Sequence, residues 1–89
     1  MTKTLDTLRQ EIDSIDDEII ALLAKRMERV TEVGQYKSIH NIAPLDEKRW
    51  QQVLQTISAK AKKQNLSEEL VKEIYELIHQ EALVIEKKV

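Results

Sequence analysis

The sequence contains no cysteine and no phenylalanine, and it has a single glycine and a single proline. The absence of cysteine excludes disulfides and cysteine-ligated zinc, and nothing indicates an oxidising compartment. An excess of either charge is also missing, because 14 Lys and Arg residues against 16 Asp and Glu residues leave a formal charge of −2. We therefore expect no binding to nucleic acid or to an anionic membrane surface. His40 and His79 have no partners at a metal-binding spacing, so we expect no metal site.

Long apolar runs are missing as well. No stretch approaches the length of a membrane span, and the N-terminal residues lack the apolar core of a signal peptide, which together predict a cytoplasmic protein. The 89 residues are enough for one small domain, residues 1–89. The scarcity of Gly and Pro, a charged fraction of 34% and the absence of strand signals favour an all-α fold.

The first predicted helix runs from Leu5 to about Ile39, with Thr4 or Asp6 as its N-cap. It would be about 54 Å long, whereas a compact domain of this size is only roughly 30 Å across. Two apolar stripes merge in its middle into an arc wider than one neighbouring helix covers: Leu5, Leu8, Ile12, Ile15, Ile19 and Leu22, with Ile20, Leu23, Met27 and Val30. Because exposure of this arc is unfavourable, we expect self-association. A long coiled coil is the alternative, which Arg26 in the seam position after Leu22 disfavours.

Two shorter helices are predicted after the only obvious break, at Pro44. This proline disfavours helix at Ala43, Asp46 is the expected N-cap of the second helix, and Ser67 caps the third after a turn at Asn65. Their apolar faces consist of Trp50, Val53, Leu54, Ile57 and Ala61, and of Leu70, Val71, Ile74, Leu77, Ile78 and Ile85. The expected fold is therefore an all-α, three-helix chain with one long N-terminal helix, in an intertwined homodimer.

Gly34 lies inside the long predicted helix, where glycine costs about 1 kcal/mol relative to alanine. Such a glycine indicates a close approach by another backbone or by a ligand. A tolerated defect is the alternative interpretation.

Three cations of the long helix have an informative spacing. Arg26 and Lys37 are about 20° apart around the helix axis and about 16 Å apart along it, so both side chains could close on one small anion. Arg9 lies about 42 Å from Lys37 along the same axis and cannot reach that anion within one chain. The spacing therefore indicates an anion site shared between subunits.

Several segments resemble the all-helical (AroQ-type) chorismate mutases: residues 8–16 (LRQEIDSID), 22–26 (LLAKR), 32–37 (EVGQYK) and 44–49 (PLDEKR). The resemblance covers nearly the whole chain without gaps and includes the spacing of all three cations. It implies an intertwined homodimer of three-helix chains with two active sites, each completed by an arginine of the other subunit. The implied activity is the cofactor-free, intramolecular conversion of chorismate to prephenate in aromatic amino-acid biosynthesis.

The resemblance also implies roles for individual residues. Arg9 of the partner chain and Arg26 would bind the two substrate carboxylates, because a guanidinium offers paired hydrogen bonds. Lys37 would face the ether oxygen, where negative charge develops. Asp46 and Arg49 match the next pocket positions, with Arg49 holding neighbouring groups in place. The alternatives are an ion pair between Arg9 and a nearby acid such as Asp13, and a solvated face for Arg26 and Lys37.

Three positions depart from the family pattern. Trp50 stands where a Glu usually accepts the ring hydroxyl, and Ala82 stands where Ser is frequent. Alternatively, Trp50 only anchors the core face of the second helix. Glu86 stands where Gln usually donates to the ether oxygen; a glutamate donates only when protonated, so we expect activity to rise toward acidic pH. A surface charge beside Lys87 and Lys88 at a frayed helix end is the alternative for Glu86.

These departures leave the substrate open. A chorismate mutase is favoured, with Arg26, Lys37 and Glu86 as catalytic residues. An isochorismate-pyruvate lyase or a 4-amino-4-deoxychorismate mutase on the same fold is the alternative, since Trp50 removes a hydroxyl acceptor. A non-catalytic helical dimerisation or regulatory module is the alternative of another class, and the retained cations argue against it.

Overall fold

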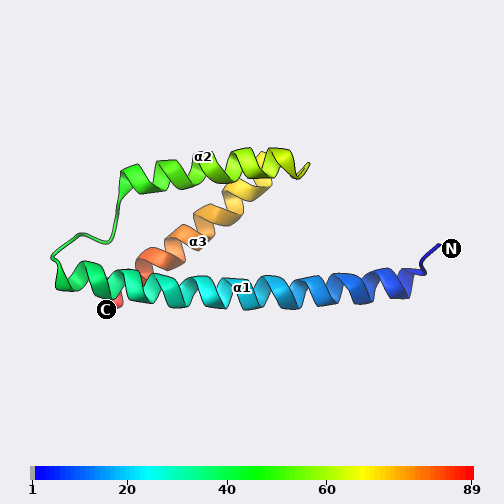
Figure 1. The fold of residues 1–89 in the computed structure, drawn as a ribbon, viewed down its shortest axis with the longest axis horizontal. Helices are drawn as coiled ribbons and strands as arrows, with labels where there is room; N and C mark the ends of the chain where they lie inside the picture. Colours follow the sequence, from blue (N-terminus) through cyan, green and yellow to red (C-terminus); the bar gives the residue numbers. More distant parts are fainter. Residues whose placement is uncertain (1) are drawn as a thin grey trace.

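The computed structural model describes residues 2–89, which form three helices and contain no strand. The helices are α1 (Leu5–Ile39), α2 (Glu47–Lys63) and α3 (Glu68–Lys88), as Figure 1 shows. The all-α prediction is confirmed, and so are the expected bounds of the long first helix. In the described part of the chain, no helix combines the length and the apolarity that crossing a membrane requires.

Each helix begins at a capping side chain that the sequence predicts. The hydroxyl of Thr4 accepts a hydrogen bond from the backbone N–H of Thr7 at 3.1 Å, so Thr4 rather than Asp6 is the first cap. Asp46 Oδ1 accepts from the backbone N–H of Arg49 at 3.0 Å, and Ser67 Oγ accepts from that of Leu70 at 3.2 Å. These bonds satisfy amide groups that have no partner within the helix, and they fix where α2 and α3 start.

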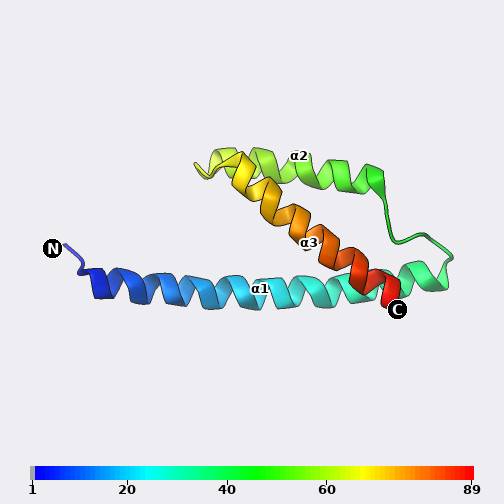
Figure 2. The ribbon, with the colours of Figure 1, turned by 180° about the vertical axis from the view of Figure 1, so that it is seen from behind.

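Helix α3 connects the other two helices. It runs diagonally from the far end of α2 back to α1, and the C-terminus lies beside the C-terminal part of α1, as both views show (Figures 1 and 2). Within the described residues α3 packs against both α1 and α2, which do not pack against each other. The N-terminal half of α1 extends beyond the other helices, so the chain measures 59 × 23 × 15 Å.

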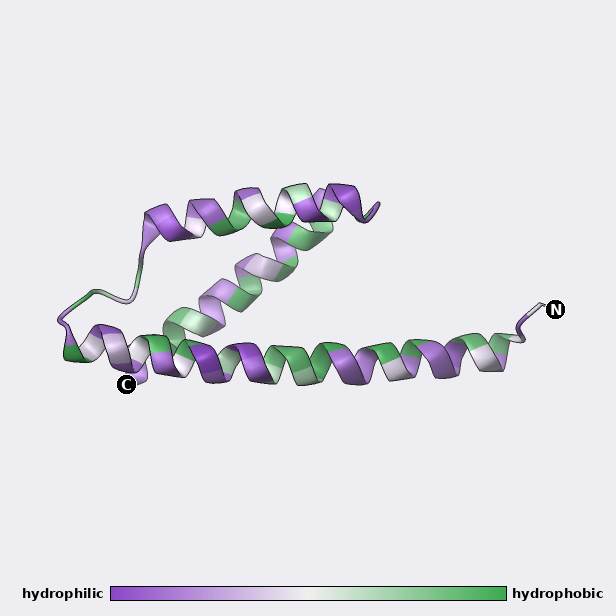
Figure 3. Cartoon of the chain, viewed as in Figure 1, coloured by the Kyte–Doolittle hydropathy of each residue, from purple (hydrophilic) through white to green (hydrophobic). Residues whose placement is uncertain are grey.

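Little of the apolar surface is covered within one chain. The buried apolar side chains among the described residues are Ile57, Ala61 and Ala82, at the contacts made by α3. Apolar bands continue along the uncovered half of α1 (Figure 3) and are made by Leu5, Leu8, Ile12, Ile15, Ile19, Ile20 and Leu22. The chain exposes 7411 Å² in total, whereas a compact monomer of this mass exposes roughly 5,400 Å².

Gly34 is buried where α1 crosses the end of α3. A Cβ atom built on Gly34 would lie 2.9 Å from the Cα of Glu86 and 2.5 Å from Cγ2 of Val89. The Val89 side chain can move aside, but the Glu86 contact is with backbone and can be relieved only by moving α3. The prediction of a close approach by another backbone is therefore confirmed.

We predict that Gly34→Ala destabilises the protein although alanine is the better helix former. The propensity gain is about 1 kcal/mol, and overpacking at a backbone contact costs about 1–3 kcal/mol. The net loss, up to about 2 kcal/mol, is measured by urea unfolding at one protein concentration. Gln35→Ala at the exposed neighbouring position is the control and should stay within about 0.5 kcal/mol of wild type. A Gly34→Ala variant more stable than wild type by about 1 kcal/mol, the gain from helix propensity alone, would contradict the contact.

Candidate active site

A cavity of about 140 Å³ lies between the C-terminal half of α1, the start of α2 and the end of α3. Its polar lining consists of Arg26, Lys37, Asp46, Arg49, Trp50, His79 and Glu86. Its apolar lining consists of Val30, Val33, Pro44, Val53 and Ala82. The structure thus gathers the predicted site residues from all three helices at one place, with the exception of Arg9.

Lys37 and Glu86 form an ion pair inside this cavity. Lys37 Nζ lies 2.8 Å from Glu86 Oε1 and donates a hydrogen bond to the backbone oxygen of Pro44 at 2.6 Å. The side chains are only 17% and 10% exposed, so the interpretation of Lys37 as part of a solvated face is wrong. Helix α3 continues to Lys88, and Glu86 is therefore not a surface charge at a frayed end. A hydrogen bond to Pro44 and an ion pair with Glu86, two groups from different segments, hold the ammonium group in one place.

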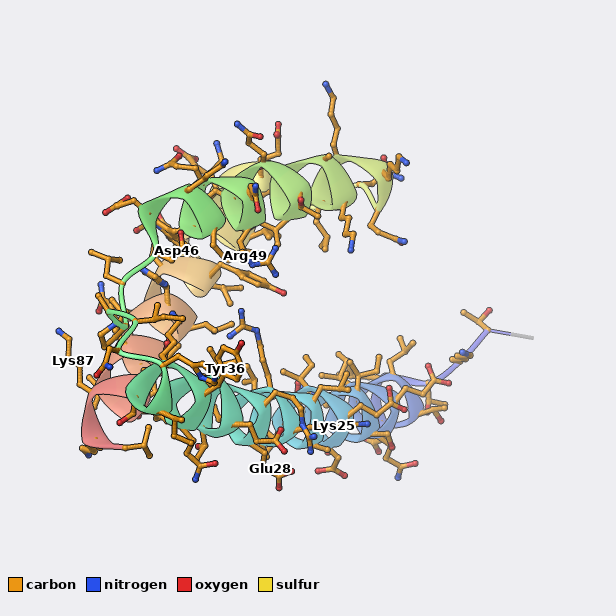
Figure 4. All side chains as sticks on the ribbon, turned by 60° about the vertical axis from the view of Figure 1, so that its left-hand side comes forward. Lys25, Glu28, Tyr36, Asp46, Arg49 and Lys87 are labelled. Carbon is orange, nitrogen blue, oxygen red and sulfur yellow. The ribbon has the colours of Figure 1, made fainter. Side chains whose placement is uncertain are left out.

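Asp46 and Arg49 lie at the start of α2, at the edge of the cavity (Figure 4). Both are exposed, and the Asp46 carboxylate is engaged by the backbone N–H of Arg49. The helix start also carries the positive end of the α2 dipole. Arg49 therefore adds a cation to a place where an anion is already favoured.

Arg26 reaches the cavity from the middle of α1 and is half-buried. The central carbon of its guanidinium lies 5.7 Å from the centroid of the Tyr75 ring on α3. A cation over an aromatic face is attracted by the negative face of the ring. Tyr75 was not predicted as a neighbour of Arg26. Glu28, two residues after Arg26, lies on the opposite face of α1, which points away from the other helices (Figure 4).

Trp50 and His79 form a stacked pair between α2 and α3. Their ring centroids are 4.0 Å apart, and their planes are inclined by 5°. Trp50 is half-buried, so it does contribute to the face of α2 that meets α3, and it also lines the cavity. His79 was not among the predicted site residues. Its spacing could have indicated that it lines the cavity. His79 lies three residues before Ala82 and seven before Glu86, which places all three on one face of α3.

Arg9 is far from this cavity. It lies in the half of α1 that extends beyond α2 and α3, and its side chain is exposed. Among residues 2–89 it forms no ion pair, so the alternative pairing with Asp13 is not seen. One chain therefore offers the cavity three cations: Arg26, Lys37 and Arg49.

The three cations of the cavity suit a small anion. Arginine binds carboxylates with paired hydrogen bonds, and lysine supplies a compact charge. Ala82 is buried and presents only a methyl group, while the valines form an apolar wall. Such a site can fold a flexible anion into one conformation and can stabilise charge that develops on it.

Residues 8–87 match the protein family described as chorismate mutase type II. The chain is 36% identical, over 90% of its own length and 21% of the relative's, to a bifunctional chorismate mutase/prephenate dehydratase of Buchnera aphidicola subsp. Acyrthosiphon pisum. It is 38% identical, over 81% of its own length and 19% of the relative's, to the T-protein of Haemophilus influenzae. It thus spans about a fifth of the length of these relatives. The family match covers nearly the whole described chain, including every residue that lines the cavity, and the chain belongs to the chorismate mutase type II family.

Proposed function

We propose that this protein catalyses the intramolecular rearrangement of chorismate to prephenate, a step of aromatic amino-acid biosynthesis. The observation that carries the proposal is Lys37, held by Pro44 and Glu86 inside a cavity that also contains Arg26 and Arg49. Family membership and the name of the Buchnera relative support the same activity.

The rearrangement breaks one carbon–oxygen bond and forms one carbon–carbon bond without a nucleophile or a cofactor. Catalysis then requires a folded substrate conformer and donors at the ether oxygen, where negative charge develops. Arg26 binds one carboxylate, and Lys37 donates to the ether oxygen. Glu86, ion-paired with Lys37 in the structure, adds a second donor there only when it carries a proton. Arg49 holds neighbouring groups, and the valines of the apolar wall keep water from the reacting atoms.

The second carboxylate is bound by Arg9 from another copy of the chain, so the active unit is a homodimer. The uncovered apolar half of α1 supports this part of the proposal. The chain exposes roughly 2,000 Å² more than a compact monomer of its mass, and an obligate dimer interface buries a total of that order or more. Pairing of two chains through this half of α1 would cover its exposed apolar residues and would bring Arg9 to the cavity of the partner chain.

A second candidate is cleavage of isochorismate to salicylate and pyruvate. Trp50 favours it, because Trp50 lines the cavity and its indole can donate a hydrogen bond but cannot accept one. A non-catalytic dimerisation module is disfavoured by the largely buried Lys37–Glu86 pair. Such pairs are costly to desolvate and are seldom needed for packing.

We predict that the purified protein converts chorismate to prephenate and does not release pyruvate from isochorismate. The products are identified by chromatography after separate incubations with the two substrates. Salicylate and pyruvate from isochorismate would favour the lyase. No turnover of either substrate would favour the non-catalytic module.

The control for this assay is a matched pair of lysine substitutions on α1. Lys37→Met should lower kcat by about 100-fold or more, because a donor to the developing charge is lost. Lys25→Met removes a lysine on the exposed surface of the same helix and should retain full activity (Figure 4). Equal activity of the two variants would contradict the role of Lys37.

We predict that two inactive variants, Arg9→Ala and Lys37→Ala, regain activity when they are unfolded, mixed and refolded together. A heterodimer of Arg9→Ala and Lys37→Ala chains has one intact site and one site with both defects. An equal mixture should regain about one quarter of the wild-type activity, since half of its dimers are mixed. Arg26→Ala with Lys37→Ala is the control, because every site of that heterodimer carries one defect. Failure of the first mixture to exceed the second would refute the shared site.

We predict that kcat for chorismate rises as the pH falls from neutral to mildly acidic values. Glu86 donates to the ether oxygen only when it carries a proton, whereas its ionised carboxylate can only accept. Glu86→Gln carries its donor at every pH, so its profile should be flat and its activity near neutrality higher than that of wild type. Rate measurements across this range in a constant-ionic-strength buffer test the prediction. A flat wild-type profile would contradict it.

A further inference from the structure

The stacked rings of Trp50 and His79 form part of the cavity wall that the mechanism above does not use. Because the planes are nearly parallel at 4.0 Å, the contact occupies the faces of both rings. The two imidazole nitrogens lie in the ring plane, at its edge, and remain outside the stacking contact. The stack therefore fixes the plane of His79 and leaves its polar atoms available.

The polar groups of the cavity are mostly hydrogen-bond donors. Arg26, Lys37 and Arg49 only donate, and so does the indole of Trp50. The groups that can accept are the side chains of Asp46, His79 and Glu86.

Two of these three acceptors are already engaged. Asp46 accepts from the backbone N–H of Arg49, and Glu86 pairs with Lys37. Within residues 2–89, His79 makes no hydrogen bond and no ion pair. Oε1 of Glu86 accepts no hydrogen bond within the described residues, but it is held by the ion pair with Lys37. Among these three side chains of the described lining, His79 is therefore the one with neither a hydrogen bond nor an ion pair; it is half-buried, and neutral imidazole carries one acceptor nitrogen.

The substrate of the proposed reaction carries one matching group. Chorismate has two carboxylates and an ether oxygen, which all accept hydrogen bonds, and a ring hydroxyl, which is its hydrogen-bond donor. We infer that His79, with its ring plane fixed by Trp50, accepts a hydrogen bond from this hydroxyl and so determines specificity for a hydroxylated ring. The inference rests on the proposed function, and it adds a residue that selects the substrate to the cations that bind it.

The position of His79 agrees with this role. His79, Ala82 and Glu86 follow one face of α3, and all three line the cavity. Glu86 lies in the part of the cavity that contains Lys37, whereas His79 lies next to Trp50 of α2. The hydroxyl acceptor is therefore separate from the donors that serve the ether oxygen.

The experiment compares His79→Phe with wild type on chorismate and on 4-deoxychorismate, the analogue without the ring hydroxyl. Phenylalanine keeps an aromatic ring against Trp50, although a six-membered one, and it removes both ring nitrogens. We expect kcat/KM of the variant to fall about 10- to 100-fold on chorismate, the usual effect of losing one buried hydrogen bond to substrate. On the deoxy analogue the variant should equal or exceed wild type, because no hydroxyl is present to pair with His79.

His40→Phe is the matched control. His40 also stacks on an aromatic ring, that of Tyr36 at 4.0 Å, but it lies outside the cavity lining. This variant should retain wild-type kcat/KM on both substrates. Equal losses of His79→Phe on the two substrates would show that His79 only packs against Trp50, and no loss on chorismate would likewise overturn the inference. Wild-type protein that turns over neither substrate would overturn the proposed function and this inference with it.

Discussion

The close approach of α1 and α3 at Gly34 brings Lys37 and Glu86 together in the cavity. The backbone of Glu86 rests against the glycine, and Lys37 follows one turn later on α1. The two oppositely charged side chains therefore meet at 2.8 Å although they are far apart in sequence. A side chain at position 34 would separate the helices and with them this pair. Glycine costs helix stability here, and the contact it permits gives the site its central charge pair.

The length of α1 is the second constraint. Its C-terminal half takes part in the cavity through Arg26 and Lys37, while its N-terminal half carries Arg9 and a row of apolar residues that no other part of the chain covers. So few side chains are buried within one chain that folding and association would be coupled in the homodimer we propose. One long helix then contributes cations to two different sites.

The cavity keeps its charges oriented before any ligand arrives. The carbonyl of Pro44 and the carboxylate of Glu86 hold Lys37, and the ring of Tyr75 lies beneath Arg26. Partly buried cations without such partners would be costly to desolvate. Charge stabilisation is effective when the donors do not have to reorganise during the reaction. The same supporting contacts therefore lower the cost of burial and prepare the site for an anion.

The helices were predictable because their signals are local. Helical periodicity, the caps at Thr4, Asp46 and Ser67, and the break at Pro44 each depend on residues close in sequence. Helical spacing and the family resemblance also indicated part of the cavity lining: Arg26, Lys37, Asp46, Arg49, Trp50, Ala82 and Glu86. They indicated neither His79 nor the valines as lining residues, and the predicted Arg9 lies elsewhere. They did not indicate that His79 stacks on Trp50 or that Tyr75 lies under Arg26.

The sequence by itself thus determined the three helices, their starting points and the cations on each face. Only the tertiary structure decided which side chains from α3 meet those of α1 and α2. The reason is physical: such contacts depend on the angle and distance at which helices cross, and these follow from packing along their whole length. No short segment of sequence contains that information.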